Sequence, residues 1–187
     1  GSIATASGQA ALHLAITTLA GAGSHIVASS ALYGGSHNLL TYTLARFGVT
    51  TTFVKPGDID GWRDAIRPET KLLFGETLGN PGLDVLDIPT VAQIAHDAGV
   101  PLLIHTGDPL AFFEPLDEHN VRLEELLEHP DWWFGDRSRF PAFDELADRF
   151  ESLVARRPDL TFVGAHAGGL AEDLARLDRM LGAYPNL

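Results

Sequence analysis

The sequence lacks cysteine entirely, and no apolar run in its 187 residues approaches the length of a membrane-spanning helix. Disulfides, thiolate zinc sites and cysteine nucleophiles are therefore excluded, and redox chemistry gives no information about compartment. No basic segment followed by an apolar one opens the chain, so we expect no secretory signal. We expect a cytoplasmic protein without a membrane partner.

Positive charge is also scarce, because the chain has 13 basic and 25 acidic side chains, which gives a net charge of −12. Such a surface repels phosphate backbones, so no nucleic-acid partner is expected. The charge is unevenly spread: residues 1–100 hold 8 acidic and 5 basic side chains, a net −3, and residues 101–187 hold 17 and 8, a net −9. This change in charge falls at residues 95–106, within a predicted helix and the strand that follows it. The sequence shows no linker there.

The remaining composition is that of a globular protein, with 45% hydrophobic and 20% charged residues. At roughly 150 residues per domain, the length predicts about one domain. Short apolar stretches bounded by glycine or proline predict five buried strands, and segments with helical periodicity lie between them. The predicted strands are His25–Ser30, Thr50–Val54, Lys71–Glu76, Pro101–Thr106 and Thr161–His166.

Buried apolar strands that alternate with helices indicate right-handed crossovers and a parallel sheet covered on both faces. We therefore expect one α/β domain over residues 1–187, with three αβα layers and a five-stranded, mostly parallel, Rossmann-like sheet. Residues 107–140 form a predicted insertion that contains one helix, at 122–127. Ligands of such sheets bind beyond the carboxyl ends of the strands, so residues that follow a strand are the candidates for a site.

Three motifs carry a resemblance to a known family. They are ASGQAA at residues 6–11, SALYGG at residues 30–35, and ETLGNP at residues 76–81, which runs on to DVLDI at 84–88. Residues 3–104 resemble the large domain of the pyridoxal-phosphate-dependent enzymes of cysteine and methionine metabolism, in particular the O-acetylhomoserine sulfhydrylases. The resemblance implies the fold that is called fold type I among pyridoxal-phosphate enzymes, and it implies binding of pyridoxal phosphate.

The resemblance assigns cofactor-binding roles to five residues. Ser7, Gly8 and Gln9 would surround the cofactor phosphate, and the predicted helix N-terminus at these positions favours an anion on physical grounds as well. Tyr33 would stack on the pyridine ring, and Asn80 would lie near its hydroxyl. From the residues alone, an ordinary helix cap at Ser7–Gln9 is favoured over an anion site.

The family pattern fails at the two positions that carry its chemistry. Where the family has an aspartate against the pyridine nitrogen, this chain has His105. The lysine that forms the Schiff base in the family has no equivalent here. Lys71 begins a predicted strand, so it lies at the edge of the sheet opposite the site, and Lys55 is not part of a sequence like the family's lysine motif. Binding of pyridoxal phosphate or phosphate without transferase chemistry is therefore one function that the resemblance leaves open.

A second resemblance begins at about residue 101 and is carried by LIHTGDP at 103–109, EHPDWWFG at 128–135 and FVGAH at 162–166. These motifs are similar to the metal-dependent amidohydrolase-related family, which is built on a TIM barrel. About two of the eight strand and helix units are present, so a closed barrel cannot form from them.

This second resemblance implies a metal site. His105 would be a metal ligand, His166 a metal-side or catalytic histidine, and Asp108 a third candidate, with zinc as the metal. The expected strand order, 2-1-4-3-5, places one strand between the two histidines and separates their backbones by about 9 to 10 Å.

The two resemblances meet inside one predicted buried strand, at residues 100–104. We therefore expect a chimera of segment 1–104 and segment 105–187, either engineered or fused naturally. Gly1 and Ser2 resemble the scar of a cleaved expression tag. Surfaces that each fragment once buried would be exposed, which predicts a homo-oligomer.

Three functions remain open at this point. The first is a non-catalytic scaffold that retains two incomplete sites. The second is weak metal-dependent amidohydrolase or decarboxylase activity carried by His105, Asp108 and His166. The third is binding of pyridoxal phosphate or simple phosphates at Ser7–Gln9 and Tyr33.

Overall fold

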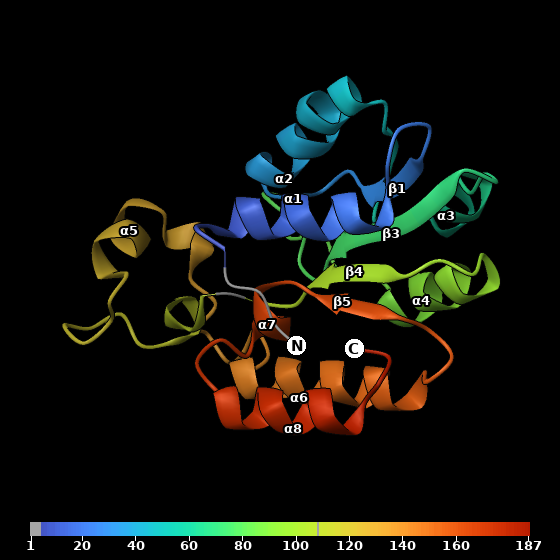
Figure 1. Cartoon of the computed structure of the whole chain (residues 1–187). Helices are drawn as coiled ribbons and strands as arrows, with labels where there is room; N and C mark the ends of the chain where they lie inside the picture. Colours follow the sequence, from blue (N-terminus) through green and yellow to red (C-terminus); the bar gives the residue numbers. More distant parts are fainter. Residues whose placement is uncertain (1–4, 108) are drawn as a thin grey trace.

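The computed structural model describes residues 5–107 and 109–187. Gly1, Ser2 and Asp108, to which the sequence assigned a tag scar and a metal ligand, lie outside the described residues. Helices cover both faces of a five-stranded sheet (Figure 1). The strands are β1 His25–Ser29, β2 Thr50–Val54, β3 Thr70–Glu76, β4 Leu102–His105 and β5 Phe162–Gly164. The α-helices are α1 Gly8–Leu19, α2 Gly34–Asn38, α3 Ile59–Asp64, α4 Ile88–Asp97, α5 Leu123–Glu128, α6 Phe143–Arg156, α7 His166–Gly169 and α8 Leu174–Ala183.

All four strand pairings are parallel, and the order across the sheet is β2-β1-β3-β4-β5. This confirms the predicted three-layer α/β fold with five strands, but the predicted order 2-1-4-3-5 is wrong. The connection through α4 is a simple crossover that places β4 beside β3, with Glu76 opposite His105 in the register. The next crossover places β5 beside β4, with Leu102 opposite Phe162. The carboxyl ends of β4 and β5 are therefore neighbours.

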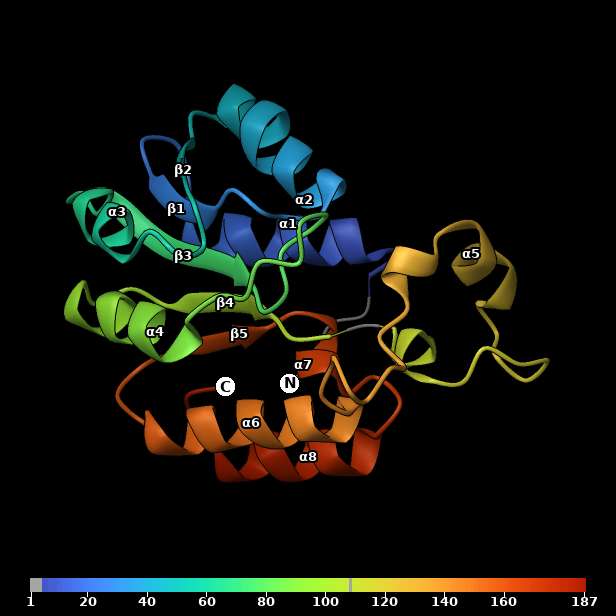
Figure 2. The same ribbon diagram turned by 180° about the vertical axis from the view of Figure 1, so that it is seen from behind.

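Alternate residues of the strands supply two separate hydrophobic cores. Ile26, Phe74 and Leu103 point to the face that α1 and the helical segment after Tyr33 cover. The residues between them in each strand point to the other face, where α3, α4, α6 and α8 pack. Figures 1 and 2 show this division, with α1 and α2 on one side of the sheet and α6 and α8 on the other. The layering follows from the period of two along each buried strand.

The predicted insertion lies beyond the carboxyl ends of the strands, and α5 projects away from the sheet in both views (Figures 1 and 2). An aromatic cluster joins it to the domain, with the Phe113 ring centroid 5.3 Å from that of Phe134 and 5.5 Å from that of Phe143. Trp133 Nε1 donates a hydrogen bond to the Glu114 carbonyl at 2.7 Å. These aromatic side chains pack the insertion against α6.

The segment after β5 differs from the prediction of a strand that continues to His166. β5 ends at Gly164, and the chain then turns with positive φ from His166 to Gly169. Thr106 Oγ1 donates a hydrogen bond to the Gly168 carbonyl at 3.0 Å, which fixes this turn against the residue that follows β4. The next helix, α8, begins at Leu174, and Asp173 is its N-cap. Among the described residues, no helix has the length and apolar character needed to cross a membrane.

Candidate functional site

The N-terminus of α1 opens at the carboxyl edge of the sheet. Ser7 is its N-cap, and the Ser7 hydroxyl accepts a hydrogen bond from the Ala10 amide at 3.1 Å. The amides of Gly8 and Gln9 belong to the first turn, where a helix offers no carbonyl partner. The first turn carries no acidic residue, so the positive end of the helix dipole is not neutralised there. This geometry is that of an ordinary helix cap, and it would also suit an anion.

Tyr33 lies beside this helix start, at the N-cap of α2. The residue is 59% exposed, and its backbone amide donates to Glu76 Oε1 at 2.9 Å. Gln9 Nε2 donates to the Gly35 carbonyl at 2.8 Å. The structure therefore brings together the predicted phosphate-binding turn and the predicted stacking residue.

His105 and His166 meet at the adjacent ends of β4 and β5. Their ring centroids are 5.0 Å apart in an edge-to-face arrangement. The predicted separation by one strand is wrong because β5 pairs directly with β4. His166 Cε1 also lies 3.3 Å from the position that a Cβ on Gly8 would take, so the second histidine borders the start of α1.

Burial determines the charge of His105. Desolvation, together with the nearby charge of His166, lowers the pKa of His105 from 6.5 to about 4. The imidazole of His105 is therefore neutral at pH 7. It cannot supply the negative charge that an aspartate would place opposite a pyridine nitrogen.

Glu76 is the residue of this region that the sequence motifs did not single out for binding. It ends β3, and only 6% of its surface is exposed. Burial raises the pKa of Glu76 from 4.5 to about 7, although the hydrogen bond from the Tyr33 amide opposes that change. The available signal was a carboxylate directly after the buried run at residues 72–75 of β3.

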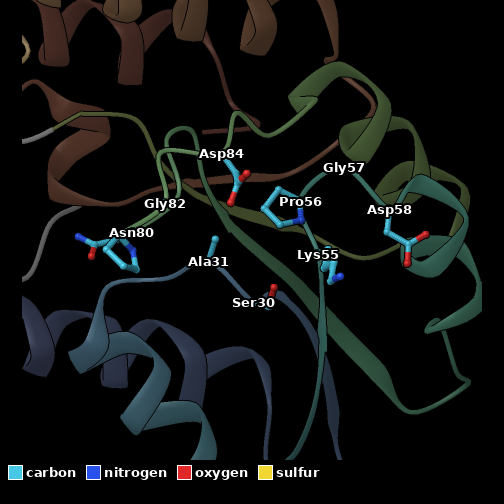
Figure 3. A pocket seen from close by; sticks show the side chains of 10 residues that line it. Ser30, Ala31, Lys55, Pro56, Gly57, Asp58, Asn80, Gly82 and Asp84 are labelled. Carbon is cyan, nitrogen blue, oxygen red and sulfur yellow. The ribbon is translucent and has the colours of Figure 1, made fainter.

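A separate open cavity of about 670 Å³ lies over the carboxyl ends of β1, β2 and β3 (Figure 3). Because the chain moves from β1 to β2 on one side and then returns to β3 on the other, this is the point where ligands of open α/β sheets usually bind. Asn80 lies at one end of the cavity, and Lys55 and Asp58 lie toward the other (Figure 3). The lining residues are Ser30, Ala31, Lys55, Pro56, Gly57, Asp58, Asn80, Pro81, Gly82 and Asp84.

The two lysines lie at opposite edges of the sheet. Lys71 is the second residue of β3, at the amino edge of the sheet and opposite the site. Lys55 follows β2 at the carboxyl edge, in the wall of the cavity that also contains Asn80. The cavity wall does not include Ser7, Gly8, Gln9 or Tyr33. Asn80 and the other predicted cofactor residues therefore do not share this cavity.

The predicted metal site has no support from the described residues. Within residues 5–107 and 109–187, no group of three or more histidine, aspartate or glutamate side chains is placed to hold an ion. His105 and His166 supply two imidazoles, and Asp108 lies outside the described residues. A structural or catalytic zinc site needs at least three protein ligands.

Comparison with known proteins gives a consistent family. The family model described as Cys/Met metabolism PLP-dependent enzyme matches residues 1–117. The O-acetyl-L-homoserine sulfhydrylase of Corynebacterium glutamicum is 50% identical over 117 residues, which are 62% of this chain and 27% of that protein. Sulfhydrylase FUB7 of Fusarium oxysporum is 48% identical over a region that covers 83% of this chain and 38% of that protein.

A solved structure agrees with these relatives. The O-acetylhomoserine sulfhydrylase of Wolinella succinogenes superposes with a TM-score of 0.52 at 40% identity, covering 54% of this chain and 28% of that one. The chain thus spans between a quarter and two fifths of the length of these relatives.

These matches support the first of the two resemblances only. The alignment with sulfhydrylase FUB7 extends past residue 104, because it covers 83% of the chain. The sheet is also continuous from β3 through β4 to β5. The predicted amidohydrolase segment and the predicted chimera therefore find no support. The chain belongs to the family of pyridoxal-phosphate-dependent enzymes of cysteine and methionine metabolism.

Proposed function

We propose that this chain binds pyridoxal phosphate noncovalently, with the phosphate at the N-terminus of α1 and the ring against Tyr33. The observation that carries the proposal is the hydrogen bond from Gln9 to the Gly35 carbonyl, at 2.8 Å. It joins the anion-binding turn to the corner that presents the exposed aromatic ring. Neither feature would define this ligand class alone, but together they offer an anion site and an aromatic face side by side.

The residues fit one part of the cofactor and do not fit another. The amides at the start of α1 suit its phosphate, and the exposed Tyr33 suits its ring. The neutral His105 does not suit a protonated pyridine nitrogen, which an aspartate stabilises elsewhere in the family. Lys71 lies at the opposite edge of the sheet, and Lys55 lies in the separate cavity. We therefore propose binding, and no transferase step, for the described residues.

The roles of the site residues follow from this geometry. Gly8 and Gln9 would donate their amides to the phosphate, and Ser7 holds the first turn in shape through its bond to Ala10. His166, which borders Gly8, would limit the space beside the phosphate. When bound, the cofactor would supply a pyridine ring that withdraws electrons, provided that a neighbouring group keeps the ring nitrogen protonated.

Binding is tested by equilibrium dialysis of the chain with pyridoxal phosphate, with pyridoxal and inorganic phosphate as competitors. We expect one molecule bound per chain, displaced by excess phosphate and poorly by pyridoxal. Absence of saturable binding would overturn the proposal. If pyridoxal displaced the bound cofactor as well as phosphate does, the contacts that hold the cofactor would lie outside the turn at Gly8.

Substitution of Tyr33 by alanine should weaken pyridoxal phosphate binding about tenfold, since an aromatic face is worth about 1.4 kcal/mol in such contacts. Inorganic phosphate should bind the variant as it binds the parent. Tyr42→Ala is the matched control, because Tyr42 is 63% exposed and Tyr33 59%. Equal losses in both variants would exclude a specific role for Tyr33.

Reduction with borohydride after addition of pyridoxal phosphate should leave no adduct at Lys55 or Lys71 beyond that of an unrelated control protein. The reason is that neither lysine lies with Tyr33 and the α1 turn in the described structure. Peptide mass spectrometry reads out the modified lysine directly. A stoichiometric adduct on Lys55, absent from a Lys55→Arg variant, would contradict the noncovalent mode.

A further inference from the structure

We infer that Glu76 is a positioning residue whose buried carboxyl group holds the Tyr33–Gly35 corner in place for ligand binding. The inference rests on the proposed function, because it concerns the aromatic residue of the same site. Its structural part can be tested without any ligand.

The carboxyl group that holds the corner comes from the central strand of the sheet. Glu76 ends β3, which pairs with β1 on one side and with β4 on the other. Its Oε1 atom accepts the hydrogen bond of the Tyr33 amide at 2.9 Å, across 43 positions of sequence. A carboxylate fixed on a strand that pairs on both sides is a rigid acceptor for a corner that connects a strand to a helix.

The corner needs such an acceptor. Tyr33 has extended backbone angles, φ −50° and ψ 137°, and its own side chain makes no capping hydrogen bond. Its carbonyl accepts from the His37 amide at 3.0 Å, which starts α2. The Tyr33 amide precedes the helix and has no carbonyl within α2 to bond with. The carboxyl of Glu76 fills this need, so removal of the carboxyl would leave that amide unpaired.

Two further contacts restrict the same corner. A Cβ on Gly35 would lie 2.6 Å from Tyr33 Cε1 and 3.2 Å from Gln9 Nε2. The Tyr33 ring therefore rests against Gly35, where a larger residue would push it away. Glu76 fixes the backbone of the corner, and Gly35 leaves the room that the ring needs.

The groups that face Glu76 are compatible with this role. His105 is opposite Glu76 in the register with β4, and it is neutral at pH 7. His166 reaches the region through its contact with His105, and Tyr33 presents its amide from the N-cap position before α2. Because burial raises the pKa of Glu76 to about 7, its charge changes in the neutral range. An ionised carboxyl is the stronger acceptor, so the corner should be held more firmly at pH 8 than at pH 6.

The test compares Glu76→Leu with Glu76→Gln. We expect Glu76→Leu to speed hydrogen exchange of the Tyr33 amide at least tenfold and to weaken pyridoxal phosphate binding about tenfold, with inorganic phosphate binding unchanged. Glu76→Gln keeps a carbonyl acceptor, so it should restore most of both properties. In this variant the protection factor of the Tyr33 amide, which is its exchange rate relative to the intrinsic rate at the same pH, and the binding of pyridoxal phosphate should no longer depend on pH between 6 and 8. Amide exchange is measured by NMR on the chain without ligand.

A second variant protects the test against a misfolded leucine variant. Gly35→Ala should move the Tyr33 ring and weaken pyridoxal phosphate binding, while the Tyr33 amide stays protected. Unchanged Tyr33 exchange in Glu76→Leu, or a glutamine variant as impaired as the leucine variant, would overturn the inference. If the parent chain binds no pyridoxal phosphate but Tyr33 exchange responds as expected, the proposed function fails and the positioning role of Glu76 stands.

Discussion

Replacement of Glu76 by glutamine should raise the free energy of unfolding at pH 8 by about 3 kcal/mol and leave it nearly unchanged at pH 4. Burial raises the pKa of Glu76 from 4.5 to about 7, and each pH unit of that difference corresponds to about 1.4 kcal/mol. Between pH 4.5 and 7 the folded chain binds the additional proton, so the parent loses stability as the pH rises through this window. Glutamine carries no charge at either pH and escapes the penalty.

His105 acts in the opposite direction. Its pKa is lowered from 6.5 to about 4, so the unfolded chain binds the additional proton between these values. This residue therefore adds stability as the pH rises from 4 to 6.5. In the parent the two slopes oppose each other between pH 4.5 and 6.5, and Glu76→Gln should expose the rising contribution of His105.

Urea denaturation at half-unit pH intervals measures these slopes. Glu172→Gln is the control, because it makes the same change at an exposed glutamate. His105→Asn should show the mirror result, a stability that falls more steeply between pH 4.5 and 7 than that of the parent. If Glu76→Gln and Glu172→Gln follow the same curve, Glu76 ionises freely in the folded state and the burial argument is wrong.

The strands were predictable because their signals are local. β2 was predicted with both of its ends, Thr50 and Val54, and every end of the other strands lies within two residues of its prediction. Apolar runs between glycine and proline residues encode these limits directly. The order of the strands depends on pairing between distant segments, which no local pattern records. That is why β4 was placed between β1 and β3, whereas it pairs with β3 and β5.

The error in strand order had a consequence for the site. It separated His105 from His166 in the prediction, whereas the structure brings their ring centroids to 5.0 Å. The helix cap at Ser7 was predicted because it needs only neighbouring residues. The bond from Glu76 to the Tyr33 amide joins residues 43 positions apart, so only the fold could reveal it. The charged end of a buried strand was its one visible sign.

Gly164→Val should destabilise the chain by about 3 kcal/mol and displace the turn that carries His166. A Cβ on Gly164 would lie 2.8 Å from Gly168 Cα and 3.0 Å from Gly168 N. Both are backbone atoms, so a rotamer change cannot relieve the clash. Gly168 also receives the Thr106 hydroxyl bond on its carbonyl, which ties the turn to the end of β4. Strand β5 and the turn would have to separate.

Gly182→Ala is the matched control for this substitution, because a Cβ on Gly182 meets no atom within 4 Å and the residue lies in α8. Alanine there should stabilise the chain by up to about 1 kcal/mol. The NMR signals of the His105 and His166 rings distinguish displacement of the turn from general loss of stability. Unshifted histidine signals together with a lowered Tm would mean that other parts of the chain move to relieve the clash, while the turn keeps its position. Shifted signals in a chain that remains folded would show that the glycine turn is what holds His166 against β4 and the start of α1.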